Sequence, residues 1–194
     1  MKKAALHNLG CKVNAYETEA MQHLLEEAGY EIVPFTQKAD VYVINTCSVT
    51  NMADRKSRQM LHKAKKNNPD SIVVATGCYV QTSEKEVLND LSVDIVIGND
   101  RKHDLVRLLE EYSLDSVNDT VDDINDGKHD FEELFIDQTK EHTRAFIKVQ
   151  DGCNQFCSYC IIPYARGRVR SRRFENVIAE VERLAANGFK EVVL

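Results

Sequence analysis

The sequence predicts an α/β protein in which parallel strands alternate with helices, and three observations support this fold class. Short apolar runs rich in β-branched residues, such as VYVIN and IVVATG, are typical of strands buried on both faces of a parallel sheet. Each run precedes a segment whose apolar residues recur at helical spacing. This strand–helix pair recurs in succession, which indicates a flavodoxin-like or Rossmann-like sheet with helices on both faces.

Four such pairs occupy residues 1–114, which we expect to form the N-terminal domain. The expected strands are 3–9, 40–46, 71–77 and 93–99, and the expected helices are 14–28, 51–67, 83–91 and 102–112. Asn14 is a residue type that caps helices at their start, and Gly29 is one that commonly ends them.

Residues 115–141 differ in composition and form a predicted acidic linker. From Asp119 to Glu141 the chain has nine acidic residues and two lysines. Such charge runs are usually solvated, so we expect an exposed and poorly ordered segment. The alternative interpretation is a cation site or a shield that mimics RNA.

Residues 142–194 resume the alternation, with an expected strand at 143–149, a helix at 175–187 and a strand that starts at 190. Because a parallel βαβ connection is right-handed, this unit is expected to open a larger parallel array. The chain ends on that strand, so we expect a fragment whose array is incomplete.

Composition limits the cellular context and the partners. No stretch of the 194 residues approaches the run of about 20 apolar residues that spans a bilayer, and the first residues lack a signal-peptide core. We therefore expect a soluble, cytoplasmic protein with no membrane partner. In that compartment the six cysteines favour metal or redox use over disulfides. The net charge of −6 argues against a broad nucleic-acid surface, so RNA contact is expected only at a local basic patch.

Three cysteines occupy equivalent positions in the N-terminal domain, and we call them the strand-end cysteines. Cys11, Cys47 and Cys78 each follow a predicted strand and precede a helix. Ligands of such folds bind outside the carboxyl ends of the parallel strands, which meet at one edge. We therefore expect the three thiols to gather there, and thiolates suit an iron–sulfur cluster. The alternative is that each cysteine is a small buried apolar residue.

Three further cysteines, the loop cysteines, lie within one short segment. Cys153, Cys157 and Cys160 have the spacing C-x3-C-x2-C, which lets three thiolates converge from a single loop. Structural zinc normally takes four ligands, whereas a [4Fe-4S] cluster held by three cysteines keeps one iron open for a substrate or cofactor. The alternative is a zinc site completed by a fourth ligand such as His142.

This segment resembles a known family. The pattern C-x3-C-x-aromatic-C, with Tyr159 as the aromatic residue, is similar to the signature of radical S-adenosylmethionine (SAM) enzymes. The longer run GCNQFCSYCIIPYARGRVRSR resembles their methylthiotransferase branch. The resemblance implies a partial or full (β/α) barrel in the second half and two [4Fe-4S] clusters. The loop cysteines would hold the cluster that binds SAM, with Tyr159 against the adenine, and the strand-end cysteines would hold the other.

Within this family, the sequence segments LGCKVNAYE and GCNQFCSYCIIPYARGRVRSR most resemble those of the branch that acts on N6-threonylcarbamoyladenosine in tRNA. The resemblance implies addition of a methylthio group to carbon 2 of this base at position 37, in the anticodon loop. Sibling branches act on isopentenyladenosine in tRNA or on a ribosomal protein. Outside the family, the alternative is a non-catalytic iron–sulfur or zinc module. The sulfur donor, the electron donor and the oligomeric state are left open.

Basic residues near the loop cysteines are candidates for RNA contact. We expect phosphate contacts from Arg166, Arg168, Arg170 and Arg172, with Arg173 beside them. The alternatives are pairing with acids at the domain junction or with the SAM carboxylate. Helix 51–67 is also basic, and there a solvated face is the favoured interpretation. The family usually carries a small C-terminal RNA-binding β-barrel, which we expect this chain to lack together with most of the radical SAM barrel.

Overall fold

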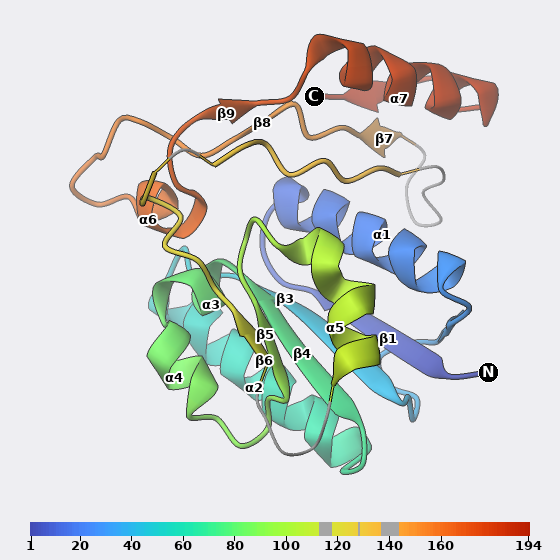
Figure 1. Ribbon diagram of the computed structural model, residues 1–194, viewed down its shortest axis with the longest axis vertical. Helices are drawn as coiled ribbons and strands as arrows, with labels where there is room; N and C mark the ends of the chain where they lie inside the picture. The colour runs from blue at the N-terminus through green and yellow to red at the C-terminus, as the bar shows by residue number, and fades with distance from the viewer. Residues whose placement is uncertain (113–117, 128, 137–143) are drawn as a thin grey trace.

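The computed structural model describes residues 1–112, 118–127, 129–136 and 144–194 (Figure 1). Its main sheet has six strands, all parallel. Their spatial order is β2 (Glu31–Ile32), β1 (Lys3–Asn8), β3 (Val41–Thr46), β4 (Ile72–Gly77), β5 (Ile95–Ile97) and β6 (Asn118–Thr120). An order that begins 2-1-3-4-5 is that of flavodoxin-like folds, so the predicted fold class is confirmed.

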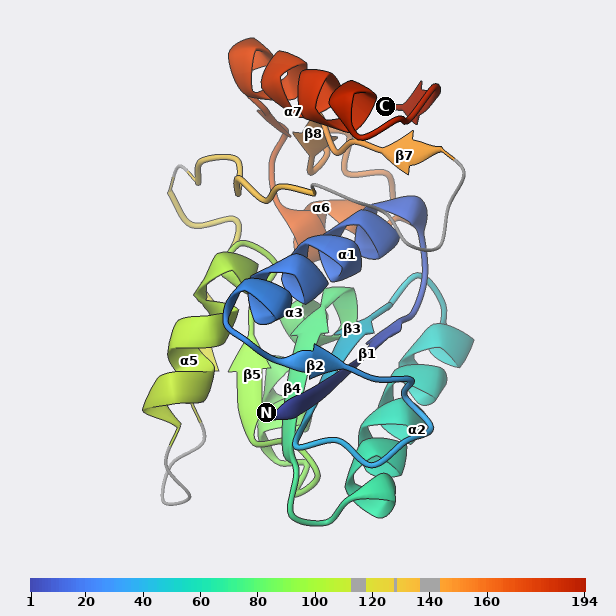
Figure 2. The same ribbon diagram turned by 90° about the vertical axis from the view of Figure 1, so that its right-hand side faces the viewer.

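Helices cover both faces of this sheet (Figure 2). One face carries α1 (Lys12–Glu27) and α5 (Leu105–Glu111). The short 3-10 helix η1 (Lys102–Asp104) directly precedes α5. The other face carries α2 (Asn51–Asn67), α3 (Cys78–Thr82) and α4 (Glu84–Leu88). Strand β3 supplies both cores, because successive side chains of a strand point to opposite faces. Tyr42 and Ile44 pack toward α2, and Val41 and Val43 pack toward α1.

Three local expectations for the N-terminal domain are corrected. The two-residue strand β2 pairs with β1 although its sequence has no apolar run. Helix α1 begins at Lys12, so Asn14 lies inside the helix and does not cap it; its side-chain amide donates to the Leu9 and Thr46 carbonyls at 2.9 Å each. The expected helix 83–91 is shorter, as α4 at Glu84–Leu88, and another short helix, α3, precedes it and begins at Cys78, where a loop was expected.

The acidic segment is partly built into the fold, which corrects the expectation of an exposed linker. Residues 118–120 form β6, whose backbone continues the parallel sheet beside β5. Ile124, Leu134 and Ile136 are buried, with exposed fractions of 1–3%. The apolar residues among the acids therefore anchor the segment. The predicted boundaries at 114/115 and 141/142 and the candidate zinc ligand His142 lie outside the described residues.

The second half is a single βαβ unit that lies over the carboxyl edge of the main sheet (Figure 2). Strands β7 (Ala145–Phe146) and β10 (Val192–Val193) pair in parallel and are connected through α7 (Phe174–Ala186), as the sequence predicts. Between them, β8 (Gln150–Asp151) and β9 (Arg170–Ser171) form an antiparallel pair, with α6 (Ile162–Arg166) just before β9. In the described ranges no helix is long and apolar enough to cross a membrane.

Candidate active site

The strand-end cysteines leave the sheet at one edge, as the sequence predicts. Cys11 comes soon after β1, and Cys47 and Cys78 directly follow β3 and β4. Thr46 is the register partner of Gly77 across β3 and β4, so the next residues of both strands emerge side by side. The strand order reverses between β1 and β3, and such switch points are where doubly wound sheets bind ligands.

Glycine at position 10 lets the Cys47 side chain approach the backbone next to Cys11. Gly10 has φ +114°, and a Cβ atom there would lie 2.9 Å from the Cys47 Sγ atom. The Cys47 thiol therefore packs against the backbone immediately before Cys11, in space that a side chain would fill. Cys11 is exposed, whereas Cys47 and Cys78 are buried. The Cys78 Sγ atom lies 3.8 Å from the Asn99 amide nitrogen, in the loop after β5.

The loop cysteines are held by the chain that follows them. Gly152 has φ +76°, and a Cβ atom there would overlap the Arg168 carbonyl. The Cys153 amide donates to the Gly167 carbonyl at 3.0 Å, and the Val169 amide donates to the Asn154 side-chain oxygen at 3.0 Å. Cys157 is exposed, and the other two loop cysteines are partly exposed. This loop is thus fixed at its base and open to solvent at its tip.

The donor chemistry of both sets fits iron–sulfur clusters, because each set offers three thiols and none is in a disulfide. The thiols are not assembled as a closed ligand set, however: across residues 1–112, 118–127, 129–136 and 144–194, no three His, Cys, Asp or Glu side chains are placed to hold a metal ion. Both trios therefore stay predicted cluster ligands. The Tyr159 ring is 90% exposed, so its role against the adenine of SAM also stays a prediction.

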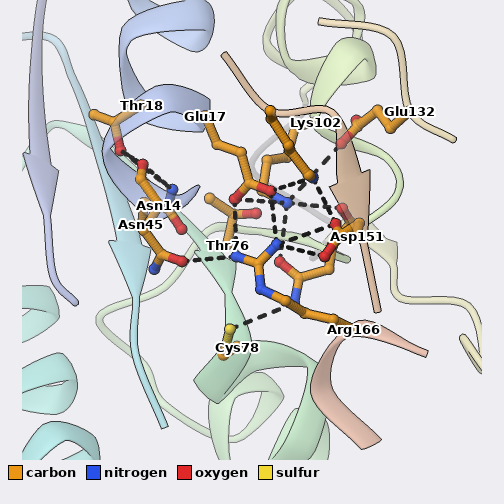
Figure 3. Close-up of polar contacts among 12 residues, drawn as sticks. Asn14, Glu17, Thr18, Asn45, Thr76, Cys78, Lys102, Glu132, Asp151 and Arg166 are labelled. Carbon is orange, nitrogen blue, oxygen red and sulfur yellow. Dashed lines mark hydrogen bonds and ion pairs between the residues drawn. The ribbon is translucent and has the colours of Figure 1, made fainter. Parts of the chain in front are cut away.

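A buried charge network joins the strand-end edge to the second half (Figure 3). The Arg166 guanidinium donates to Glu17 at 2.9 Å, to Asp151 at 3.1 Å and to the Asn14 side-chain oxygen at 2.7 Å. Lys148 donates to Glu17 at 2.7 Å. Glu17 and Asn14 belong to α1 and the other three residues to the second half. The network thus crosses between the two parts of the chain, next to Cys11.

The network nearly balances acids and bases, and Arg170 adds one further cation 4.0 Å from Asp151 at its margin. Three acids (Glu17, Glu132, Asp151) face three bases (Lys102, Lys148, Arg166), with all six side chains at most 5% exposed. Burial alone would raise the pKa of Glu17, but the surrounding cations lower it well below its usual value. Burial likewise opposes ionisation of Arg166, yet Glu17 and Asp151 hold its pKa well above the usual value. Both groups therefore stay charged at neutral pH.

Cys78 lies within the field of this network. Burial raises the pKa of its thiol, and the Arg166 cation opposes that rise. At neutral pH the thiol is accordingly protonated, and metal binding would have to displace its proton.

The structure places two of the four candidate RNA-contacting arginines in the interior, which corrects the expectation for them. Arg166 is engaged as described above, and Arg172 bonds Glu180 and, at 2.9 Å, Glu133. Both make the internal pairs that the sequence left as an alternative. Arg168 remains exposed, and its guanidinium lies 4.2 Å from the centre of the Phe156 ring. The Arg170 side chain is 9% exposed and donates to the Arg166 carbonyl at 3.0 Å.

Sequence reasoning missed the acids and lysines of the network. One signal was present: Asn14 and Glu17 fall on the helix face that also carries Met21 and Leu25, so two polar residues lie on an apolar face. A buried polar residue needs a partner. The identity of that partner was not readable, because Arg166 lies 149 residues from Glu17 along the chain.

Comparisons with known proteins agree with this two-part organisation. The model of the family described as "Uncharacterized protein family UPF0004" matches residues 3–98, and that of the "Radical SAM superfamily" matches residues 147–194. The first match covers all three strand-end cysteines, and the second covers all three loop cysteines.

Two curated relatives share the name threonylcarbamoyladenosine tRNA methylthiotransferase MtaB. The protein of Bacillus subtilis is 47% identical over 196 residues, covering 100% of this chain and 43% of the relative. That of Aquifex aeolicus is 45% identical over 194 residues, covering 99% and 47%. The chain therefore spans less than half the length of these relatives.

Among solved structures, the radical SAM methyltransferase TsrM of Kitasatospora setae, with tryptophan and a SAM analogue bound, is similar with a TM-score of 0.62. The sequence identity is 15%, and the match covers 99% of this chain and 47% of TsrM. At this identity the likeness shows a shared fold.

Proposed function

Because the chain belongs to the radical SAM methylthiotransferase family, we propose that it is part of an enzyme that adds a methylthio group to carbon 2 of N6-threonylcarbamoyladenosine at position 37 of tRNA. The observation that carries the proposal is that 47% identity extends over the whole chain, through both cysteine sets. The base lies in the anticodon loop, where bases are single-stranded and accessible to an active site.

The family implies SAM and a [4Fe-4S] cluster, and we propose a second cluster for this chain. The loop cysteines would hold the cluster that binds SAM, with Tyr159 against its adenine, and the strand-end cysteines would hold the other. When bound, these groups would supply the electron, the SAM-derived radical and the sulfur that the transfer needs.

The protein's own residues support this chemistry by positioning. Arg166 ties α6, which begins two residues after Cys160, to Asn14 and Glu17 of α1. The charges of this junction are buried, so water is excluded from the contact that Arg166 makes with Glu17 and Asp151. The exposed Arg168 remains a candidate for contact with tRNA phosphates, whereas the Arg170 side chain is 9% exposed and lies 4.0 Å from Asp151.

Mass spectrometry of tRNA nucleosides tests the proposal. In cells that lack the gene, the methylthio mark on N6-threonylcarbamoyladenosine should disappear while the unmodified base accumulates. A profile that keeps this mark overturns the proposal, and loss of the mark on isopentenyladenosine instead would reassign the substrate.

Metal content is the second test, and it addresses the cofactors separately. Anaerobically prepared protein should be brown and hold about eight iron atoms, since two four-iron clusters are proposed. A colourless, zinc-containing protein would contradict both cluster assignments.

A further inference from the structure

Helix α2 presents an exposed basic face that no internal contact explains. The helix carries six basic residues and one acid, in a chain of net charge −6. Four of the cations are exposed: Arg55, Lys56, Lys63 and Lys66. With 3.6 residues per turn, all four fall within an arc of about 100°. The opposite face, with Ser57, Leu61 and Ala64, is buried against the sheet.

The remaining two cations of α2 lie off this face and have partners in the domain. Arg58 donates to the Tyr79 hydroxyl at 3.0 Å, and Lys65 pairs with Asp94 at 2.7 Å. In the part of the chain that the structure describes, the four exposed cations form no ion pair. Arg58 and Lys65 therefore stabilise the domain, whereas the four exposed cations form a basic face whose charge is not paired with acids of the described residues.

This face begins next to the strand-end cysteines. The Ser57 hydroxyl accepts from the Cys47 amide at 3.2 Å and donates to the Cys47 carbonyl at 3.1 Å, which fixes the first turns of α2 at the cysteine edge. From Arg55 to Lys66 the basic face then runs about 16 Å along the helix axis, since each residue rises 1.5 Å. Met52, which is 59% exposed, lies on the same face near its start.

We propose that this face of α2 binds the backbone phosphates of the RNA substrate. The proposal rests on the proposed function and extends it. A base inserted at the cysteine edge leaves its flanking backbone outside, and a cationic strip that starts at that edge can follow several phosphates. The favoured occupant is an RNA strand rather than an acidic protein, because a cationic strip about 16 Å long, with no acid paired to it among the described residues, can contact successive phosphates of one backbone.

Salt dependence of RNA binding tests the proposal. The probe is a hairpin with the sequence of an anticodon arm, and its affinity for the protein is measured from about 50 to about 200 mM KCl. The variant is Lys56→Gln, Lys63→Gln and Lys66→Gln together; glutamine keeps helix propensity. Each lost phosphate contact lowers the slope of log K against log salt by about 0.7–0.9, so the slope should fall by about 2–3.

The matched control removes the same charge elsewhere. Lys2, Lys3 and Lys190 are exposed and do not belong to α2, and their triple change to glutamine should leave the slope within about one of the original. Equal effects of the two triple variants would show a general charge effect and overturn the proposal, as would an unchanged slope in the α2 variant. Circular dichroism confirms that each variant is folded.

The same probe separates this inference from the proposed function. Phosphate contact does not depend on the base, so hairpins with adenosine and with N6-threonylcarbamoyladenosine should show the same loss of slope in the α2 variant. If methylthiolation of the modified base is absent while the slope changes as expected, the proposed function fails and the RNA-binding face stands. If the modified base is methylthiolated but the slope does not change in the α2 variant, the proposed function stands and the RNA-binding face is ruled out.

Discussion

The strand-end cysteines and the loop cysteines belong to the same junction but are brought there in opposite ways. Cys11, Cys47 and Cys78 are 31 or more residues apart in sequence, and the parallel sheet alone gathers them at one edge. The loop cysteines lie within eight residues and are held by one turn of chain. One set therefore depends on the integrity of a domain core, and the other depends on local backbone geometry and on the charge network around Arg166.

The largest expected effect comes from breaking the network that joins the two sets. Arg166→Met leaves Glu17 and Asp151 buried without their main cation, and loss of one partner of a buried pair costs about 3–5 kcal/mol. Urea denaturation should show this loss in the free energy of unfolding. Arg168→Met is the control, since Arg168 is exposed, and should cost less than about 1 kcal/mol. Equal losses would mean that the network does not hold the junction.

The pH dependence of stability measures the same network without mutation. The pKa values of Glu17 and Asp151 are lowered from 4.5 and 3.8, so the unfolded chain binds protons at a higher pH than the folded protein does. Their contribution is therefore complete above about pH 5 and is lost as the pH falls through the lowered values. Each carboxyl adds a slope of up to about 1.4 kcal/mol per pH unit.

Urea titrations between about pH 3 and pH 6 check this slope. Arg166→Met should flatten it, because the variant lacks the cation that lowers both pKa values most. A slope that is the same in the variant would assign the acid sensitivity to other carboxyls.

Substitution of the glycine before the loop cysteines should reduce stability less than loss of Arg166, and its effect on iron content should distinguish the two cysteine sets. Gly152→Ala places a Cβ atom against the Arg168 carbonyl at φ +76°, so the loop must move, and we expect a loss of about 2–3 kcal/mol. Iron bound by the loop cysteines should fall while that of the strand-end cysteines remains, giving about four atoms in place of about eight.

Two further glycines make this comparison specific. Gly188 has φ +92°, but no atom lies within 4 Å of the position that a Cβ would take. The Gly188→Ala variant should therefore lose only about 1–2 kcal/mol through backbone strain and should keep all the iron. Gly10→Ala places a Cβ atom 2.9 Å from the Cys47 Sγ atom and should affect only the strand-end iron. Identical iron loss in all three variants would mean that the effect is general destabilisation.

The smallest effect on stability is expected at the tip of the loop. Tyr159 is 90% exposed, so Tyr159→Ala should change the free energy of unfolding by less than about 0.5 kcal/mol. If the ring packs on the adenine, SAM affinity should fall about tenfold, measured by equilibrium dialysis. Phe174→Ala, at another exposed aromatic residue, should leave SAM affinity unchanged. Unchanged affinity in Tyr159→Ala would remove this residue from the site.

Much of the fold was readable because its signals are local. Apolar β-branched runs specify β3 and β4, and the position of a cysteine after each strand specifies the edge at which its thiol emerges. β2 and β6 were missed, since an edge strand of two or three residues is formed by pairing with its neighbour and carries no pattern of its own.

The sequence by itself determined the parallel sheet, the loop cysteines and the family to which they point, because each rests on patterns within short stretches; the strand-end cysteines could be grouped only through the strand that precedes each of them. Only the tertiary structure decided which charged side chains are buried and paired and which face solvent. Arg166 and Arg168 differ by two positions, yet the first is buried against Glu17 and the second faces solvent. The residues next to an arginine in the sequence do not indicate which acid it will pair with. The pairing of Arg166 with Glu17 follows from the packing of α1 against the second half.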